Sequence, residues 1–244
     1  MAKETNEMAR LSLVLPSMNE KANLEILIPD IEHAFSKVSH EIIVVDAHSP
    51  DGTKELCEKL NRKYGNIRVI QRTKYDLGHA LKEGYAAARG FFILSSDSDL
   101  SFSTKDMRSL YAKIEQGYDL VVGCRHSKGG RYEAKQPLTL IKYLISRTGN
   151  RLIVALFGLK VHDFSVNFRI FRKSLIETVR LRRSDNSILF EMILKAHVAG
   201  MRLAEIPVTF RERRFGRSKL KLFSESLKFF MTLFSFFPIR WKRV

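Results

Sequence analysis

Short apolar runs alternate with longer amphipathic segments over the first half of the chain. Five runs are too short for surface helices and predict buried strands near residues 11–15, 42–46, 67–70, 91–96 and 120–123. Apolar residues at helical spacing predict helices near 20–35, 53–64, 77–89 and 104–116. Because strand and helix alternate, we expect an α/β fold with a mostly parallel sheet flanked by helices.

The pattern changes after Gly130. Residues 137–157 form a long apolar and basic helical segment, 188–198 predict another helix, and 202–210 predict a strand with Pro207 at an edge. Residues 229–237 contain only two polar residues and have basic flanks, but they are too few to span a bilayer, which takes about 20 apolar residues. We therefore expect amphipathic helices at the C-terminus that lie in a membrane interface, and the alternative is a terminal helix docked on the sheet.

The composition bounds the size of the fold and the chemistry of its partners. With 244 residues and 45% hydrophobic content, the chain can bury one sizeable core, which we assign to residues 1–220, followed by a membrane-associating segment at 221–244. The formal net charge of +16 implies an anionic partner, which could be nucleic acid, acidic lipid or a phosphorylated substrate. Half of that charge lies in residues 202–244, beside the Phe-rich segment, and no helix-turn-helix, RNA-recognition or zinc pattern occurs. We therefore expect a membrane surface and no nucleic acid as partner.

The two cysteines and the N-terminal sequence indicate in which cellular compartment the protein is expected. Cys57 and Cys124 lie far apart, which predicts neither a disulfide framework nor a metal-ligand spacing and fits a reducing cytoplasm. The first seven residues are polar and lack the apolar stretch of a signal peptide. We expect no export by that route.

Asp97-Ser98-Asp99 follows the predicted strand at 91–96 and is the strongest chemical feature of the chain. Two carboxylates at positions i and i+2 project to the same side where a strand ends. Hard oxygen ligands on a rigid strand end suit Mg²⁺ or Mn²⁺, which keep open positions for substrate phosphates. The alternative is a solvated turn that caps the next helix.

A second predicted strand also ends in an acid, Asp46, followed by small loop residues. Ligands of open α/β sheets bind outside the carboxyl ends of the strands, so acids collected there indicate a nucleotide crevice. The chain contains neither a G-x-G-x-x-G nor a Walker A sequence, which argues against a dinucleotide site and a P-loop.

Several motifs in this order resemble the family 2 glycosyltransferases of the polyprenyl-phosphate type. They are Leu15-Pro16-Ser17-Met18-Asn19-Glu20, Val45-Asp46-Ala47-His48-Ser49-Pro50-Asp51-Gly52-Thr53, Leu77-Gly78-His79-Ala80, Asp97-Ser98-Asp99-Leu100, Val122-Gly123-Cys124-Arg125, Glu205-Ile206-Pro207 and Phe210-Arg211-Glu212-Arg213-Arg214-Phe215-Gly216-Arg217-Ser218-Lys219-Leu220. The resemblance covers residues 11–220 and implies a nucleotide-diphospho-sugar transferase of the GT-A type.

The resemblance also implies roles for particular residues. The nucleotide pocket would be lined by Pro16, Asn19, Glu20 and Asp46, and the metal that bridges the donor diphosphate would be bound by Asp97 and Asp99. Arg125 and Arg147 would contact the acceptor phosphate, while Arg213 and Lys219 would close a loop over the donor. Several negative charges in one cleft need a metal and basic side chains to neutralise them, which agrees with these roles.

Three positions depart from the family pattern. Ala47 stands where a second Asp often helps to recognise the base, and Ser101 stands where a Gln often supplies a third metal contact, so Ser101 would ligate weakly or through water. Val166-Asn167 replaces the usual Ser-Gly before Phe168-Arg169.

What the resemblance implies is an inverting, metal-dependent enzyme that moves a hexose from a nucleotide-diphospho-sugar donor to a polyprenyl or dolichyl phosphate. Mannose from GDP-mannose is the leading expectation, and UDP-glucose is the alternative donor. The enzyme would be peripheral, at the cytoplasmic face of the cell or ER membrane, with or without a separate membrane subunit. A nucleic-acid-binding protein and a scaffold without catalysis are the alternatives from other classes, and the intact Asp97 and Asp99 argue against the scaffold.

Overall fold

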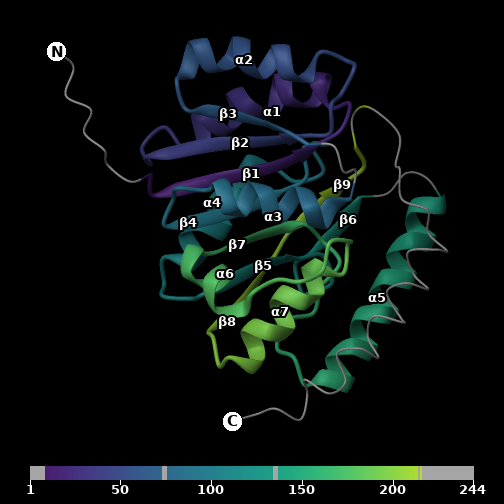
Figure 1. Ribbon diagram of the computed structural model, residues 1–244. Coiled ribbons are helices and arrows are strands. Elements are labelled where there is room, and N and C mark those ends of the chain that lie inside the picture. Colours follow the sequence, from purple (N-terminus) through teal and green to yellow (C-terminus); the bar gives the residue numbers. More distant parts are fainter. Residues whose placement is uncertain (1–8, 73–75, 134–136, 214, 216–244) are drawn as a thin grey trace.

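A seven-stranded sheet forms the centre of the computed structural model, which describes residues 9–72, 76–133, 137–213 and 215 (Figure 1). In spatial order its strands are β3 (Ile67–Gln71), β2 (His40–Asp46), β1 (Leu11–Ser17), β4 (Phe92–Ser96), β7 (Phe168–Arg172), β5 (Leu120–Cys124) and β8 (Leu203–Pro207). Neighbouring strands are parallel except at β7, which is antiparallel to both β4 and β5. The mostly parallel sheet is therefore confirmed. A separate two-stranded sheet pairs β6 (Arg131–Glu133) with β9 (Thr209–Arg211).

Helices lie on both faces of the sheet (Figure 1). The described helices are α1 (Lys21–Ala34), α2 (Thr53–Tyr64), α3 (Leu77–Ala87), α4 (Thr104–Ile114), α5 (Pro137–Phe157), α6 (Lys173–Val179) and α7 (Ile188–Val198). Helix α1 packs against α2 and α4, while α3 lies over β1 and β2. Helix α5 stands beside the rest of the fold (Figure 1).

The central strands are buried on both faces, which explains their continuous apolar runs. Every residue of β4 and β5 is buried, and so are most residues of β1 and β2. A parallel sheet covered by helices on both sides has no solvent face, so its strands lack the alternation of a half-exposed sheet. This is why length and flanking turns were enough to predict these strands.

The sequence predicted neither the short strand β6 nor strand β7 and helix α6. The β7 sequence, Phe-Arg-Ile-Phe-Arg, carries two arginines, yet Arg169 is fully buried and donates hydrogen bonds to the backbone carbonyl oxygens of Leu189 and Val166. A charged residue on an inner strand breaks the apolar pattern that predicts such strands. The strand expected at 202–210 is divided into β8 and β9, and Pro207 ends β8 at the edge of the sheet, as predicted.

The strand directions bring distant segments to one edge of the sheet. Strands β1, β2, β4 and β5 end there, and the antiparallel β7 begins there, because Ser96 pairs with Phe168 and Val122 pairs with Arg169. The residues just before β7 therefore lie beside those just after β4 and β5. We call this edge of the sheet the carboxyl edge.

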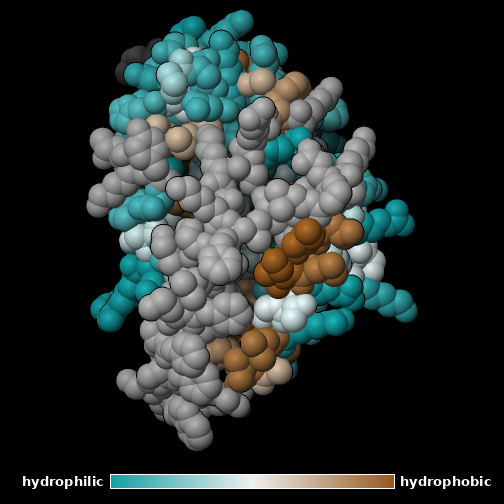
Figure 2. Space-filling view, turned by 90° about the vertical axis from the view of Figure 1, so that its right-hand side faces the viewer, coloured by the Kyte–Doolittle hydropathy of each residue, from teal (hydrophilic) through white to brown (hydrophobic). Residues whose placement is uncertain are grey.

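Helix α5 has an inward and an outward side. Asn150, Ile153 and Phe157 are buried. Large apolar side chains are exposed on the other side, and Figure 2 shows apolar groups gathered on the face that α5 forms; the exposed residues are Leu140, Ile141, Leu144, Ile145 and Leu152. Within the described part of the chain, no helix is both long and apolar enough to cross a membrane. The expected C-terminal interfacial helix lies outside the described residues.

The close packing of α3 gives a test of the fold. A Cβ atom on Gly78 would lie 2.3 Å from the backbone carbonyl carbon of Ser184, in the segment before α7. We expect Gly78→Ala to lower the free energy of unfolding by about 1–3 kcal/mol, the usual cost of overpacking. In the matched control, Gly149→Ala in α5, the added methyl has no atom within 4 Å and should be neutral or stabilising. Urea denaturation measures both variants, and equal stability of the two would contradict this packing.

Candidate functional site

The loop after β4 is tied to the end of β1. Ser98 is buried, and its Oγ donates a hydrogen bond to the carbonyl oxygen of Pro16 at 3.0 Å and lies 2.8 Å from Ser17 Oγ. Leu100 has a φ of +62°, a left-handed conformation that is costly for a residue with a bulky side chain. The loop is therefore held in a shape that its own sequence does not favour.

Both carboxylate oxygens of Asp99 accept hydrogen bonds. Its Oδ1 accepts a hydrogen bond from the Ser101 backbone N–H at 3.1 Å, and its Oδ2 accepts one from Arg213 Nη2 at 3.0 Å. The Arg211 N–H donates to the Ser101 carbonyl oxygen at 3.0 Å. This bond holds the end of β9, and Arg213 two residues later, beside the loop. Asp99 and Arg213 are therefore in contact although they are 114 positions apart in the sequence, and the roles that the resemblance implies for them stay predictions.

Asp97 lies beside the start of β7. Its Oδ1 accepts a hydrogen bond from Asn167 Nδ2 at 3.1 Å. Burial, followed by the nearby charge of Asp99, raises the pKa of the Asp97 carboxyl to about 7. Two carboxylates that are forced together in a partly dry site favour either a proton or a cation between them.

The loop fits a divalent cation. The Arg213 guanidinium beside Asp99 shows that a positive charge is accommodated there. The Ser101 hydroxyl is buried and makes no hydrogen bond within the described residues, which leaves its oxygen available to a ligand. No group of three or more His, Cys, Asp or Glu side chains forms a metal cluster in the described ranges. A metal here would thus take two carboxylates from the protein and the rest of its shell from substrate and water.

The expected nucleotide-pocket residues lie at the ends of the adjacent strands β1 and β2. Asp46 is fully buried, and its carboxylate accepts hydrogen bonds from the Ser49 N–H at 3.0 Å and from Gln71 Nε2 at 2.7 Å. Asn19 has a φ of +56°, and its N–H donates to Ser49 Oγ at 2.7 Å. Glu20 accepts a hydrogen bond from Asn23 Nδ2 at 2.5 Å. Asp46 therefore shapes the loop around Ser49, and the direct nucleotide contacts of these residues and of Pro16 stay predictions.

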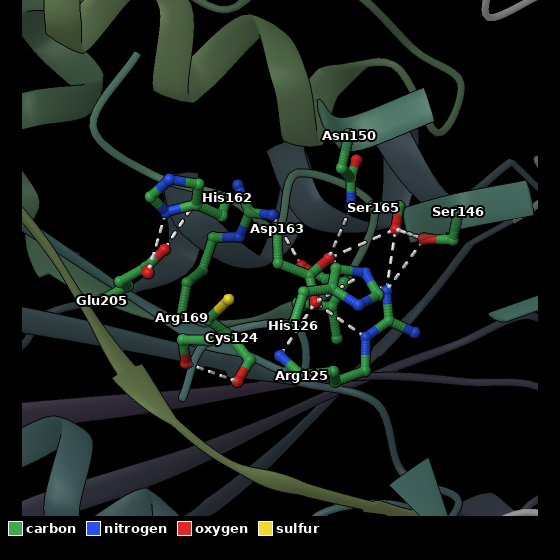
Figure 3. Close-up of polar contacts among 12 residues, drawn as sticks. Cys124, Arg125, His126, Ser146, Asn150, His162, Asp163, Ser165, Arg169 and Glu205 are labelled. Carbon is green, nitrogen blue, oxygen red and sulfur yellow. Dashed lines mark hydrogen bonds and ion pairs between the residues drawn. The ribbon is translucent and has the colours of Figure 1, made fainter. Parts of the chain in front are cut away.

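Arg125 forms the centre of a polar network at the end of β5 (Figure 3). Its Nε and Nη2 donate to the two oxygens of Asp163, at 2.8 and 2.9 Å, and Nη2 also donates to Ser165 Oγ at 2.8 Å. The guanidinium lies 5.9 Å from the ring centroids of both Tyr132 and Phe210. The Arg125 charge lowers the pKa of the buried Asp163 against the opposing effect of burial. This bidentate pair fixes the plane of the guanidinium.

Arg147 faces a basic hollow of about 320 Å³, which we call the basic pocket. Its lining residues come from the loop after β5, from α5, and from β8 and the segment before β7; they are His126, Ser127, Lys128, Arg147, Arg151, His162 and Glu205. Burial, aided by the charges of Arg125, Arg147 and Arg151, lowers the pKa of His126 to about 4. The Arg147 Nε is buried and has no hydrogen-bond partner among the described residues. The basic pocket is therefore suited to an anion.

The structure adds two residues to the predicted site and leaves one undescribed. Asp163, which holds Arg125, and Asn167, which holds Asp97, were not predicted as site residues, although Asn167 belongs to one of the departures from the family pattern. Both could be found only by knowing that β7 is antiparallel. Lys219 lies outside the described residues.

The family is shown by comparison with known proteins. Residues 12–180 match the model of glycosyl transferase family 2, and the chain belongs to this family. It is 34% identical over 217 residues to the dolichol-phosphate mannosyltransferase of Pyrococcus furiosus, an alignment that covers 87% of this chain and 59% of that protein. It is 30% identical over 219 residues to the polyprenol monophosphomannose synthase of Mycolicibacterium smegmatis, covering 86% of this chain and 81% of that protein. The resemblance deduced from the motifs is confirmed, and the chain spans 59% of the length of the Pyrococcus relative.

Solved structures confirm the GT-A-like fold. Glucosyl-3-phosphoglycerate synthase of Mycobacterium tuberculosis, in complex with phosphoglyceric acid, superposes with a TM-score of 0.71 at 19% identity, covering 93% of this chain and 79% of that one. The same enzyme in complex with Mn²⁺, uridine diphosphate and glucosyl-3-phosphoglycerate gives the same TM-score, identity and coverage. At this identity the likeness shows the fold alone.

The raised pKa of Asp97 predicts how metal binding depends on pH. A metal requires the ionised carboxylate, and below pH about 7 the Asp97 carboxyl is mostly protonated. We expect the affinity for Mn²⁺, measured by calorimetry with GDP present, to fall by up to about tenfold for each pH unit below that value. Affinity that is constant from pH 6 to 8 would contradict the assigned environment of Asp97.

Proposed function

We propose that this protein transfers a hexose from a nucleoside-diphosphate sugar to a polyprenyl or dolichyl phosphate, with mannose from GDP-mannose as the leading donor. The observation that carries the proposal is that Asp97, Asp99 and Arg213 lie together at the carboxyl edge. Two carboxylates and a guanidinium cation are suited to bind a metal ion and a diphosphate. The two named relatives, a dolichol-phosphate mannosyltransferase and a polyprenol monophosphomannose synthase, support the sugar and the acceptor class.

Asp97 and Asp99 would hold Mg²⁺ or Mn²⁺ on the donor diphosphate. The Ser101 hydroxyl, which has no hydrogen-bond partner among the described residues, is a third oxygen on the same loop, close enough in sequence to act directly or through water. The bound ion would act as a Lewis acid and neutralise charge on the leaving diphosphate. Arg213, already beside Asp99, and Lys219 would share that charge.

The acceptor needs no general base from the protein. A phosphate monoester has a second pKa of about 6, so it is mostly a dianion at neutral pH. One of its oxygens attacks the anomeric carbon, the bond from that carbon to the diphosphate oxygen breaks, and the nucleoside diphosphate leaves with the electron pair. Direct displacement on an α-linked donor gives a β-linked lipid product. The protein therefore supplies position and counter-charge.

The basic pocket is the proposed contact region for the acceptor phosphate. Arg147 and Arg151 reach it from α5, and Lys128 reaches it from the loop after β5. Arg125 lies at the same strand end, where its bonds to Asp163 hold the guanidinium rigid while Nη1 donates no hydrogen bond within the described residues. A rigid guanidinium with one free edge can orient a phosphate without losing side-chain entropy.

We further propose that the enzyme is peripheral, at the cytoplasmic face of a membrane. Residues 1–220 would form the catalytic domain, and residues 221–244, together with the exposed apolar side of α5, would contact the lipid (Figure 2). A lipid acceptor favours such an arrangement because its phosphate lies at the membrane surface beside the basic pocket. A separate membrane subunit is compatible with it.

The test of the proposed function is transfer to a defined lipid. Purified protein is incubated with polyprenyl phosphate in vesicles, Mn²⁺ and either labelled GDP-mannose or labelled UDP-glucose. We expect a β-linked mannosyl lipid, and Asp99→Ala should lower kcat/KM by at least about 10³-fold, because losing a Lewis acid costs several kcal/mol in the barrier. The matched control is Asp30→Ala, which removes an exposed acid of α1.

The outcomes of this assay distinguish a wrong donor from a wrong mechanism. Transfer from UDP-glucose alone would replace the donor and keep the chemistry. An α-linked product, or an Asp99→Ala variant as active as Asp30→Ala, would overturn the mechanism.

The proposed membrane contact is tested by sedimentation with anionic vesicles. The double variant Ile141→Glu with Leu144→Glu places charge on the exposed side of α5, and truncation after Leu220 removes the C-terminal segment. We expect each change to lower the bound fraction, since apolar contact and basic residues act together, at about 1 kcal/mol per basic residue. Gln116→Glu, an exposed residue after α4, is the charge control. Unchanged pelleting of both altered proteins would contradict the membrane proposal.

A further inference from the structure

Asn167 is the last residue before β7 and lies against the proposed metal site. The pairing of Ser96 with Phe168 places Asn167 beside Asp97, one position beyond the end of the ladder. Its side chain is buried, and Nδ2 donates to Asp97 Oδ1 at 3.1 Å. Among the described residues, Asn167 is the one hydrogen-bond donor to the Asp97 carboxylate.

The other end of the Asn167 amide is held by a buried chain of hydroxyl groups. Ser95 Oγ donates to Asn167 Oδ1 at 2.6 Å, and Tyr85 OH donates to Ser95 Oγ at 3.1 Å. Tyr85, on α3, and Ser95, on β4, are both buried, so water does not compete for these bonds.

The chemistry of the two ends fixes the direction of the chain. When Asp97 is ionised, as a metal ligand must be, its carboxylate can only accept, so the NH₂ end of Asn167 must face it and the carbonyl end must face Ser95. The Ser95 hydroxyl then donates to Asn167 and accepts from Tyr85. With Asp97 ionised, the Tyr85 and Ser95 hydroxyls therefore each donate in one direction, and the Asn167 amide has one orientation.

We propose that Asn167 is a positioning residue for the metal ligand Asp97, held in place by the relay from Tyr85 through Ser95. The bond from Nδ2 fixes Oδ1 of Asp97 and directs the second oxygen, Oδ2, to the cation. This inference rests on the proposed function, because it takes Asp97 to be a metal ligand. Hydrogen bonds of this kind to metal ligands commonly contribute 10–100-fold in metal affinity.

Asn167 is suited to this role because it is neutral. A lysine or arginine in its place would neutralise Asp97 and compete with the metal, whereas an aspartate would add a third negative charge and lose the donor. A glycine would leave the Asp97 carboxylate without its donor and the Ser95 hydroxyl proton without its acceptor in a buried site.

The experiment measures Mn²⁺ binding directly, from the free-ion EPR signal, in the full-length protein with GDP present. We expect Asn167→Ala to raise the Kd for Mn²⁺ by about 10–100-fold. Tyr85→Phe removes one hydroxyl at the far end of the relay and should raise the Kd measurably but less than Asn167→Ala does, by about two- to tenfold. If Asn167→Ala fails to fold, Tyr85→Phe carries the test alone.

The matched control is Asn150→Ala. Asn150 is also a buried asparagine whose Nδ2 donates to an aspartate, Asp163, at 3.3 Å, but that aspartate pairs with Arg125. Its loss should leave the Kd for Mn²⁺ unchanged within about twofold, whatever it does to stability. A purely structural role of Asn167 would make the two asparagine variants alike.

Asp97→Ala separates a failure of this inference from a failure of the proposed function. If the wild type binds Mn²⁺, Asp97→Ala abolishes binding and Asn167→Ala or Tyr85→Phe binds like the wild type, the positioning role is overturned and the metal site stands. If the wild type binds Mn²⁺ with neither GDP nor UDP, or Asp97→Ala binds as tightly as the wild type, the metal site and this inference both fall.

Discussion

The site depends on one constraint of the sheet, the antiparallel insertion of β7 between β4 and β5. Because β7 begins where its neighbours end, residues 163–167 lie at the carboxyl edge between the loop after β4 and the loop after β5. One end of this segment, Asp163, binds Arg125, and the other, Asn167, binds Asp97. A single short stretch of backbone thus sets the distance between the proposed metal site and the basic residues proposed for the acceptor.

The two halves of the site treat buried charge differently. Asp163 is fully buried but faces a bidentate guanidinium, which keeps its pKa low and makes the pair a rigid support. Asp97 receives one neutral donor and the repulsion of Asp99, which leaves its charged form poorly compensated. A divalent cation would stabilise the ionised form of Asp97, whereas the charge of Asp163 is already compensated by Arg125. The electrostatics therefore distinguish the charge-paired Arg125 and Asp163 from the poorly compensated Asp97, at which a cation is proposed to bind.

Much of the fold could be predicted from the sequence because parallel strands buried on both faces have a simple signature. The short apolar runs and the helices between them predicted the sheet, and the acids at the ends of β2 and β4 predicted the edge at which we propose that ligands bind. Strand β7 was not predicted because of Arg169. The sequence does not distinguish a buried arginine that donates to backbone carbonyl oxygens from an exposed one. Without β7, neither Asp163 nor Asn167 could be placed. Asp163 is 38 positions from its partner Arg125, and Asn167 is 70 positions from its partner Asp97.

The proposed metal site is tested most directly by a crystal structure with Mn²⁺ and GDP, in which the ion is located by its anomalous scattering. We expect a manganese peak about 2.1 Å from carboxylate oxygens of both Asp97 and Asp99 and in contact with the diphosphate. Arg213 should leave the Asp99 oxygen and turn to the diphosphate. A nucleotide bound with its diphosphate away from these acids, with the Arg213–Asp99 pair intact and manganese absent from the loop, would contradict the proposed metal site.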